Sequence, residues 1–297
     1  LCIQTLPALL AGVEVVLHPR FDPTAWLDEM HTSRPTLSLL VPATMRAVFE
    51  HPRWADTSLA CLRGIMTGSS TVPVAYLETL HARGVPVGQV YGTTETGPVS
   101  IVLRLPEAMA GVGASGWPQP EAQVKLIDAQ GQEVGTGETG EVCIRADNLM
   151  RGYWRAEGEL NAGVQDGWFH SGDLGQRAED GCITIVGRSK DMIISGGENI
   201  YPAEIENQLV TLPGVAENAV VGVADARWGE VPVAVLVRTP SATGQALTAE
   251  AVLQHLQSRI ARFKLPRRVV FVDSLPKSAL GKVQKPALQA LLTGANP

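Results

Sequence analysis

The segment Tyr91-Gly92-Thr93-Thr94-Glu95 follows an apolar run at positions 85–91 and ends it with a polar turn. A turn of this kind at the end of a strand offers backbone N–H groups and two threonine hydroxyls, a combination that suits an anion. The carboxylate of Glu95 adds a hard oxygen ligand of the type that Mg²⁺ prefers. A capped turn with a solvated glutamate fits the same residues equally well, so the segment by itself leaves both interpretations open.

Strand-like and helix-like segments alternate before this turn. This alternation, with apolar strands, predicts a parallel sheet that helices cover on both faces. Ligands on such sheets bind beyond the carboxyl ends of the strands, and the segments that follow residues 67 and 91 both fall at such ends. Strands are expected at 13–17, 36–41, 62–67 and 85–91, and helices at 22–33, 42–50 and 72–82.

The rest of the chain changes pattern twice. From about residue 111, glycines separate short strand candidates, which favours an antiparallel, barrel-like unit. After Asp191, helices that start at Pro202 and Thr248 alternate with apolar runs, as in a small α+β domain. We therefore expect the α/β fold class, with an α/β part at 1–110, a β-rich subdomain at 111–189 and a small domain at 190–297. The strands of this half are expected at 124–127, 140–145, 183–186, 215–223, 231–237 and 268–272.

The length and composition exclude several classes of protein. A chain of 297 residues can bury a substantial core, and 45% hydrophobic with 18% charged residues is ordinary for a globular protein. The net charge of −6 leaves no basic surface for nucleic acid, and no apolar run is long enough to span a membrane. The cysteines form no metal-type pair and are expected to be free thiols in a reducing cytoplasm: Cys2, Cys61, Cys143 and Cys182.

Three further motifs follow the turn at 91–95 along the chain. They are WFHSGD at 168–173, GRSKD at 187–191 and KSALGKV at 277–283. In this order the four motifs resemble the adenylate-forming superfamily of acyl-CoA synthetases, peptide-synthetase adenylation domains and luciferases. The resemblance covers nearly the whole chain and implies the later part of a large adenylation domain at 1–189, followed by a small mobile domain at 190–297. The family's N-terminal phosphate loop does not precede Leu1, so we expect a C-terminal portion of such a protein.

The resemblance implies a nucleotide site on the large domain. Thr94 would contact the α-phosphate and Glu95 would hold Mg²⁺. A fixed aspartate can accept hydrogen bonds from both hydroxyls of a ribose, and the family's aspartate does so at the position of Asp173. Arg188 matches an arginine that also contacts the nucleotide, whereas His170 is expected to be a structural hydrogen-bonding residue. The remaining nucleotide-binding candidates are Gly68, Ser69, Gln89, Val90, Tyr91, Gly92 and Thr93.

The resemblance also places a hinge, a CoA-binding loop and a catalytic lysine in the last third of the chain. Lys190 lies where the family rotates its small domain between two half-reactions, and a polar turn between strands is the alternative interpretation. The loop Ser195-Gly196-Gly197 resembles the loop near the tunnel for CoA. Lys282 is the catalytic candidate, because a compact ammonium cation suits the negative charge that builds around phosphorus during adenylation. A solvated basic loop with Lys277 and Lys285 is the alternative.

The implied function is that of an AMP-forming acyl-CoA synthetase, an acid–thiol ligase with fatty acid metabolism as its expected context. A small carboxylic acid and ATP, with Mg²⁺, would give an acyl-adenylate and pyrophosphate, and CoA would then give acyl-CoA and AMP. The small, uncharged pocket-wall candidates at 68–71 and 96–98 favour an aliphatic or aryl acid. The alternatives are an amino-acid-activating adenylation domain of a peptide synthetase and a non-catalytic nucleotide-binding fragment. Without the phosphate loop we expect the chain alone to be inactive, and its acid, acceptor and oligomeric state stay open.

Overall fold

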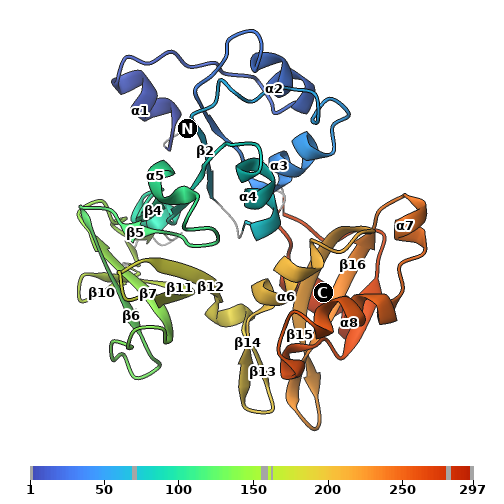
Figure 1. Cartoon of the computed structure of the whole chain (residues 1–297). Coiled ribbons are helices and arrows are strands. Elements are labelled where there is room, and N and C mark those ends of the chain that lie inside the picture. Colours follow the sequence, from blue (N-terminus) through green and yellow to red (C-terminus); the bar gives the residue numbers. More distant parts are fainter. Residues whose placement is uncertain (1–2, 69–71, 155–159, 162, 279–281, 295–297) are drawn as a thin grey trace. The chain divides into compact units, whose positions relative to one another are not determined.

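A computed structural model of the chain describes residues 3–68, 72–154, 160–161, 163–278 and 282–294. The chain divides into two compact units, Leu1–Ile185 and Val186–Pro297 (Figure 1). The first unit contains a mixed sheet with helices and a separate antiparallel sheet, and the second is a smaller unit of helices packed on one sheet. This arrangement confirms the α/β fold class, while the boundary expected between residues 189 and 190 stays a prediction.

The mixed sheet of the first unit carries the predicted parallel strands. Its elements are α1 (Thr5–Leu10), α2 (Pro23–Glu29), β1 (Leu37–Leu39), α3 (Pro42–Phe49), β2 (Gly64–Gly68), α4 (Val74–His81), β3 (Val87–Tyr91), η1 (Thr94–Thr96), β4 (Ile101–Leu103), α5 (Leu105–Ala108) and β5 (Trp117–Pro118). The strand order is β1-β2-β3-β4-β5. Strands β1 to β3 run parallel, as the alternating pattern predicts, and β4 and β5 extend the sheet in the antiparallel direction.

Two helices hold the parallel strands in place. Met45 of α3 and Leu77 of α4 are buried in one core with Ile65 of β2 and Val87 of β3. Burial of side chains of this size contributes about 1.5–3 kcal/mol each. In the register of β2 and β3, Gly68 lies opposite Val90, so the carboxyl ends of both strands reach the same edge of the sheet. The turn at 91–95 leaves the sheet at this edge.

The strand expected at 13–17 is wrong. These residues adopt no regular structure, and Val13, Val16 and Leu17 are exposed. A strand satisfies its backbone groups through a neighbouring strand, and no strand in the described part of the chain pairs with this segment. The apolar run therefore predicted a strand, but apolar composition alone does not supply the neighbouring strand that it would pair with.

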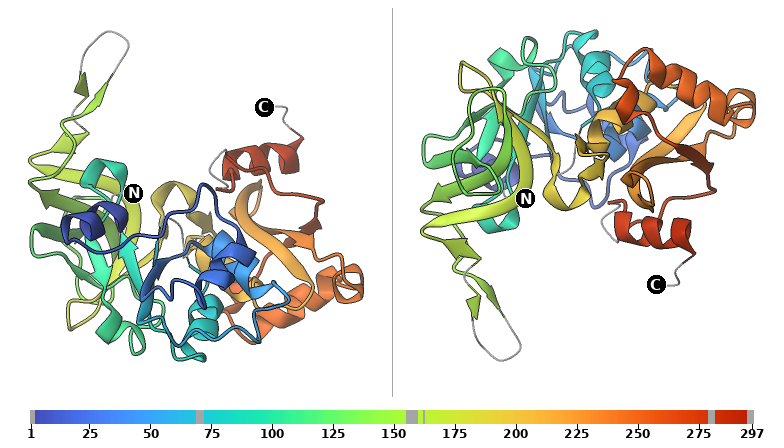
Figure 2. Two further views of the ribbon diagram at one scale, coloured as in Figure 1. Left: turned by 90° about the horizontal axis from the view of Figure 1, so that it is seen from above. Right: turned by 90° about the horizontal axis from the view of Figure 1, so that it is seen from below.

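The second sheet of the first unit is antiparallel, as predicted. Its strands are β6 (Ala122–Ile127), β7 (Thr139–Ala146), β10 (Val164–Gln165), β11 (Trp168–Arg177) and β12 (Ile183–Arg188). They pair in the order β10-β11-β7-β6, with β12 also beside β11. The short strands β8 (Tyr153–Trp154) and β9 (Leu160–Asn161) form a separate two-stranded ribbon that projects from this sheet (Figure 2).

This sheet is open along its described strands and does not close into the barrel-like unit that the sequence suggested. Closure would need β12 to pair beyond β11, but the start of β12 is already occupied. Ile183 pairs with Gly116, and its carbonyl accepts hydrogen bonds from the N–H groups of Ser115 and Gly116. Gly116 has a φ of 104°, and a Cβ there would lie 2.0 Å from the carbonyl oxygen of Val102. Only glycine fits this close approach between the two sheets of the first unit.

The second unit is built on one sheet with helices on both faces. Its elements are η2 (Ser189–Asp191), β13 (Ile193–Ser195), β14 (Glu198–Ile200), α6 (Pro202–Leu209), β15 (Val215–Asp225), β16 (Gly229–Arg238), α7 (Ala242–Gln245), α8 (Ala249–Gln257), η3 (Arg262–Lys264), β17 (Arg268–Phe271) and α9 (Lys285–Thr293). The strand order is β14-β13-β16-β15, with β17 parallel to β16. The predicted cap of α8 is present, because Thr248 Oγ1 accepts a hydrogen bond from Ala251 N at 3.2 Å.

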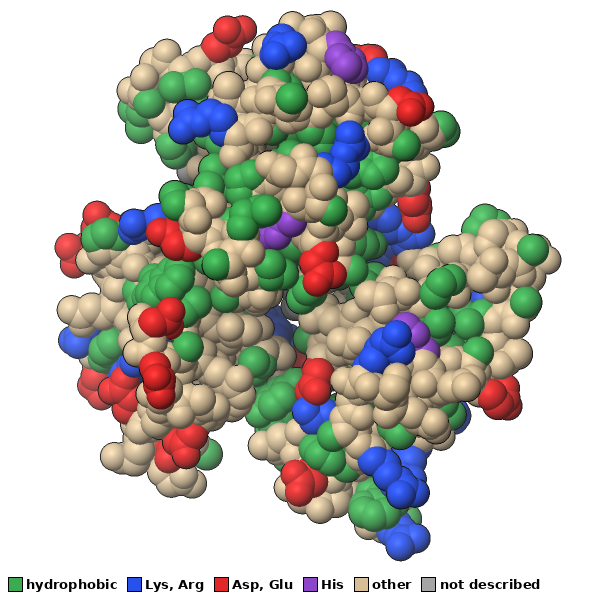
Figure 3. Space-filling view, viewed as in Figure 1, with side chains coloured by type: hydrophobic (Ala, Val, Ile, Leu, Met, Phe, Trp, Pro, Cys, Tyr) green, Lys and Arg blue, Asp and Glu red, His purple; other side chains and the backbone are tan. Residues whose placement is uncertain are grey.

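The alternation of side chains along β15 divides the core of the second unit into two parts. Val220 faces the core that α6 and α8 cover, whereas Val221 faces the core that Leu288 of α9 closes. Successive residues of a strand point to opposite faces, so one apolar strand supplies both cores. No helix within the described ranges is long and apolar enough to cross a membrane. Acidic and basic side chains are interspersed over the face shown in Figure 3.

Candidate functional site

The turn that follows β3 is fixed by a small network of hydroxyl groups. Thr96 Oγ1 accepts hydrogen bonds from Thr93 N at 3.1 Å and from Ser100 Oγ at 2.9 Å. Thr96 and Ser100 are both buried. A Cβ on Gly92 would lie 2.8 Å from backbone atoms of Gly97 and Pro98, so the turn folds back tightly on itself. Thr96, expected as a pocket wall, is therefore an internal support of the turn.

Glu95 is anchored to the segment that leads into the β8–β9 ribbon. The hydroxyl of Tyr153 donates a hydrogen bond to Glu95 Oε1 at 2.7 Å, and Met150 N donates to the carbonyl of Glu95 at 2.7 Å. The hydrogen bond to Glu95 raises the pKa of the Tyr153 hydroxyl above its ordinary value. Glu95 is therefore held in place by two contacts, which differs from the solvated glutamate that was the alternative interpretation. No local signal in the sequence connects Tyr153 with Glu95.

Asp173 lies against the end of β3. It is 7% exposed, and its Oδ2 accepts a hydrogen bond from the hydroxyl of Tyr91 at 2.8 Å. The two residues are 82 positions apart in the sequence and come from different sheets. The structure thus brings the motif at 168–173 and the turn at 91–95 together, as two parts of one site require.

A bulge in β11 presents Asp173. The pairing of β11 with β7 shifts register between His170 and Leu174, so the backbone in between leaves the ladder. Side chains accept the hydrogen bonds of this backbone instead. Glu141 Oε1 accepts from Gly172 N at 3.0 Å, and Ser171 Oγ accepts from Asp173 N at 3.0 Å. The sequence does not reveal the contact of Glu141 with Gly172, because it depends on the pairing of two distant strands.

His170 forms the structural contacts that were expected of it. Its Nδ1 lies 3.3 Å from Glu141 Oε2 and 3.5 Å from Cys143 Sγ. Burial and the nearby Glu141 carboxylate raise the pKa of the Cys143 thiol to about 11. Cys61, Cys143 and Cys182 are free thiols, as predicted, whereas Cys2 lies outside the described residues.

The remaining candidates of the first unit differ in how they could reach a ligand. The amide of Gln89 donates from Nε2 to the carbonyl of Ala114 at 2.7 Å, so this side chain is occupied within the protein. Val90 is buried. Gly68 ends β2, where a Cβ would lie 2.5 Å from the carbonyl oxygen of Val90. Ser69 lies outside the described residues.

The other site candidates belong to the second unit and are described within it. Arg188 ends β12, and Lys190 lies in the single turn η2; both are exposed. Their position relative to Asp173 stays a prediction. The loop Ser195-Gly196-Gly197 is the turn between β13 and β14, where both glycines have positive φ values, 60° and 88°.

The loop at Gly196 contacts an aromatic side chain with basic neighbours. Gly196 N donates to the carbonyl of Trp228 at 2.8 Å, and Trp228 is partly exposed. The guanidinium carbons of Arg227 and Arg267 lie 5.0 Å and 5.2 Å from the centroid of the Trp228 ring. Figure 3 shows basic side chains gathered at the tip of the β15–β16 hairpin. An aromatic face beside two cations suits an anionic, planar ligand.

Lys282 differs from the lysines on either side of it. Lys277 Nζ pairs with Glu217 at 2.7 Å, and Lys285 Nζ pairs with Glu206 at 2.9 Å. Lys282 is exposed, and no ion pair joins its ammonium to the residues that the structure describes. Its backbone is held in a turn, since its carbonyl accepts from Ser278 N at 2.8 Å. The basic loop of the alternative interpretation thus contains two neutralised lysines and one that is available to a ligand.

Two family models match separate parts of the chain. Residues 1–154 match the family model described as AMP-binding enzyme, and residues 204–282 match the model described as AMP-binding enzyme C-terminal domain. The chain is 47% identical over 289 residues to an indoleacetate–CoA ligase of Aromatoleum aromaticum, covering 97% of this chain and 56% of the relative. It is 42% identical over 280 residues to a feruloyl-CoA synthase of Amycolatopsis sp, covering 94% and 56%.

Solved structures also match nearly the whole chain. The o-succinylbenzoate CoA synthetase of Bacillus subtilis, in complex with its acyl-adenylate intermediate, superposes with a TM-score of 0.84 at 32% identity, covering 96% of this chain and 57% of that one. ATP-bound MatB of Rhodopseudomonas palustris also gives 0.84, at 34% identity, covering 97% and 56%. The chain therefore spans just over half the length of the proteins it matches.

The contact between Tyr153 and Glu95 predicts a pH-dependent signal. The neutral hydroxyl is the form that donates, so the contact stabilises the fold fully below pH ~10 and is lost as pH rises through the raised pKa. Glu95→Gln removes the charge and should lower the pKa of Tyr153 toward its ordinary value. Ultraviolet titration of tyrosinate formation measures the change.

A matched pair of variants isolates this titration step. Tyr153→Phe should remove the step whether residue 95 is Glu or Gln, and Tyr201→Phe should leave it in place. If the step in Glu95→Gln coincides with that of the unmodified chain, the contact does not govern the ionisation of Tyr153.

Proposed function

Because the chain belongs to the AMP-binding enzyme family, we propose that it is part of an AMP-forming acyl-CoA synthetase, which is an acid–thiol ligase. The reaction joins a carboxylic acid to ATP as an acyl-adenylate with release of pyrophosphate, and then transfers the acyl group to the thiol of CoA with release of AMP. Curated relatives at 47% and 42% identity are CoA ligases, which supports CoA rather than a carrier protein as the acceptor.

The observation that carries the proposal is the hydrogen bond between Tyr91 and Asp173. It joins two separate motifs into one polar surface, at the strand ends where ligands of such sheets bind. The buried carboxylate of Asp173 is proposed to accept hydrogen bonds from the ribose hydroxyls of the nucleotide. Thr94 and the backbone of the turn are proposed to contact the α-phosphate, with Arg188 as a further nucleotide contact.

Glu95 is proposed to hold Mg²⁺. The residues fit this ion, because Tyr153 fixes the Glu95 carboxylate, and Thr93 and Thr94, which precede it in the same turn, carry further hard oxygen donors. When bound, Mg²⁺ would neutralise charge on the phosphates of ATP. Tyr153 holds the carboxylate in place, and other N–H groups of the turn are proposed to bind the phosphate oxygens.

We propose an acid with an aromatic group as the substrate. The names of the two relatives at 47% and 42% identity refer to indoleacetate and ferulate. Among the pocket-wall candidates, Gly97 and Pro98 carry no charge, which fits a substrate whose only charged group is the reacting carboxylate. Assays with indoleacetate, ferulate and a fatty acid of similar length would separate this proposal from an aliphatic substrate.

Lys282 is proposed to stabilise the charge that develops around phosphorus during adenylation. Its ammonium is exposed on a backbone turn, whereas its neighbours are paired with glutamates. A single turn, η2, with the exposed Lys190 lies near the start of the second unit and is proposed as the hinge for its rotation. The Gly196 loop and Trp228, with Arg227 and Arg267, are proposed to hold the adenine and phosphates of CoA.

Asp173→Asn should weaken the binding of AMP to the 297-residue chain. Loss of charge-assisted hydrogen bonds corresponds to about 1.5–3 kcal/mol, or about 10- to 150-fold in affinity. Titration calorimetry measures the change. Asp166→Asn, in the exposed turn just before β11, is the matched control and should bind AMP normally. Equal affinities for Asp173→Asn and the unmodified chain would exclude Asp173 as a ribose ligand.

Lys282→Ala should lower the rate of acyl-adenylate formation by about 10²–10³-fold in an active protein that contains this chain. Thioester formation from a supplied acyl-adenylate should largely persist, because the charge on phosphorus develops in the first step. Pyrophosphate exchange and CoA consumption measure the two steps separately.

Lys285→Ala is the control, since it removes a nearby lysine that is already paired with Glu206. It should leave both half-reactions close to normal. The same two assays test the proposed hinge at Lys190. Lys190→Pro fixes the φ angle of this residue at about −65°. It should therefore slow one half-reaction and spare the other. Equal losses of both half-reactions in Lys282→Ala would contradict a role confined to adenylation.

Trp228→Ala should raise the KM for CoA about 10-fold, because stacking of a base on an aromatic ring contributes roughly 1–3 kcal/mol. The rate of acyl-adenylate formation should stay the same. Trp154→Ala removes another exposed tryptophan, on β8, and should leave the KM for CoA unchanged. A normal KM in Trp228→Ala would place the CoA site elsewhere.

A further inference from the structure

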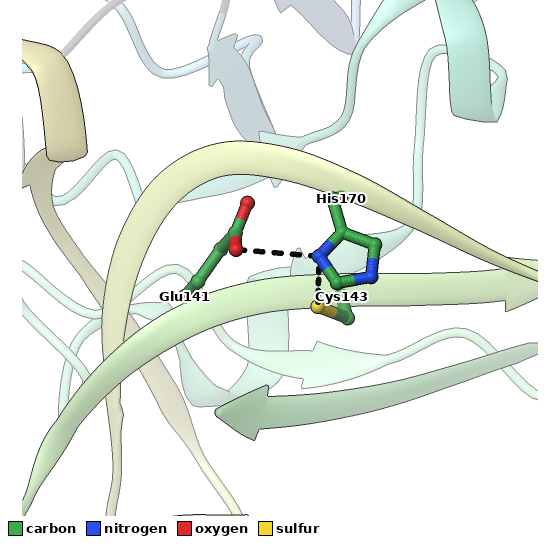
Figure 4. A group of neighbouring side chains, drawn as sticks. All are labelled: Glu141, Cys143 and His170. Carbon is green, nitrogen blue, oxygen red and sulfur yellow. Dashed lines mark hydrogen bonds and ion pairs between the residues drawn. The ribbon is translucent and has the colours of Figure 1, made fainter. Parts of the chain in front are cut away.

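A glutamate, a cysteine and a histidine meet on one face of the antiparallel sheet in the first unit (Figure 4). Glu141 and Cys143 are two residues apart on β7, so their side chains point to the same face. His170 of β11 is the register partner of Cys143. One potential ligand atom from each residue lies within 4.8 Å of the other two.

The two distances from His170 Nδ1 to the other ligand atoms match edges of a zinc coordination tetrahedron. With usual bond lengths to zinc, a tetrahedral site separates imidazole nitrogen from thiolate sulfur by about 3.6 Å, and from carboxylate oxygen by about 3.4 Å. His170 Nδ1 lies 3.5 Å from Cys143 Sγ and 3.3 Å from Glu141 Oε2. The third pair, Cys143 Sγ and the Glu141 carboxylate, lies within 4.8 Å, so the three ligand atoms are close enough to approach one ion.

A hydrogen bond from outside the cluster orients the Glu141 carboxylate. Glu141 uses its other oxygen, Oε1, to accept a hydrogen bond from Gly172 N at 3.0 Å, which leaves Oε2 turned toward His170. Such a hydrogen bond is the usual means by which proteins orient a ligating carboxylate. Lys125, opposite Cys143 on β6, directs its ammonium to the ring of Trp168, 4.5 Å from the centroid.

Solvent has access to the cluster from one side. Cys143 is buried, but the side chains of His170 and Glu141 are 31% and 28% exposed. An ion could enter past these two residues, and a water molecule could fill the fourth position. A thiolate and a carboxylate would together balance the two positive charges of a divalent ion, so the bound group would be neutral.

We propose that Glu141, Cys143 and His170 form a binding site for Zn²⁺. The set of sulfur, nitrogen and oxygen donors suits zinc and other borderline ions and does not suit Mg²⁺, which prefers oxygen ligands. The site is thus chemically distinct from the one at Glu95, and it is independent of the proposed reaction. A bound ion would link β7 to β11 next to the bulge that presents Asp173.

Titration of the whole 297-residue chain with Co²⁺, a spectroscopic substitute for Zn²⁺, tests the site. Thiolate-bound tetrahedral Co²⁺ has a sulfur-to-metal charge-transfer band and visible d–d bands. We expect both sets of bands to saturate at one ion per chain and to disappear when Zn²⁺ is added. Cys143→Ser should abolish the charge-transfer band, whereas Cys61→Ser and Cys182→Ser should retain it.

Two further variants keep the test decisive if Cys143→Ser fails to fold. His170→Asn and Glu141→Gln each replace a partly exposed ligand, and both should weaken binding of Co²⁺ at least about 10-fold. Zn²⁺ should raise the melting temperature of the unmodified chain by binding the folded state, but not that of these variants. The proposal is overturned by a folded chain without a charge-transfer band, by a band that persists in Cys143→Ser, or by unchanged affinity in both His170→Asn and Glu141→Gln.

Discussion

The first unit depends on how one buried carboxylate is satisfied. A carboxylate removed from water is costly unless it is hydrogen-bonded, and Asp173 is 7% exposed. The hydroxyl of Tyr91 meets it at 2.8 Å, and Tyr91 itself packs against the core of the antiparallel sheet. Asp173 can occupy this position only because β11 leaves its ladder after His170. The bulge, the contact of Glu141 with Gly172 and the position of β3 are therefore parts of a single arrangement.

Local signals in the sequence predicted the elements that local interactions stabilise. The prolines at 23 and 42 and the cap at Thr248 marked the starts of three helices, and apolar runs marked the three parallel strands. The run at 13–17 was misleading, because apolar composition does not supply a neighbouring strand. The antiparallel sheet predicted as barrel-like stays open for a related reason: Ser115 and Gly116 bond the start of β12, and this contact joins residues far apart in the sequence.

In the candidate site, too, some features could be predicted from the sequence and others could not. The sequence predicted that the turn at 91–95 and Asp173 would converge, because a resemblance between whole motifs carries information about distant contacts. It did not reveal Tyr153 beside Glu95 or Glu141 beside Gly172, since both depend on strand register and on loops that fold back. Nor could it show that Lys277 and Lys285 are paired, because their partners Glu217 and Glu206 lie far away in the chain.

Two cations lie near the ring of Trp168, with Lys125 Nζ and Arg145 Cζ each 4.5 Å from its centroid. Indole emission responds to the electric field around the ring, and this ring lies two residues from His170 on the same face of β11. The chain therefore contains its own optical probe beside the bulge. Changes of charge or position in this strand can be followed by fluorescence without attaching a dye, and Trp168→Phe would separate its emission from that of the other tryptophans.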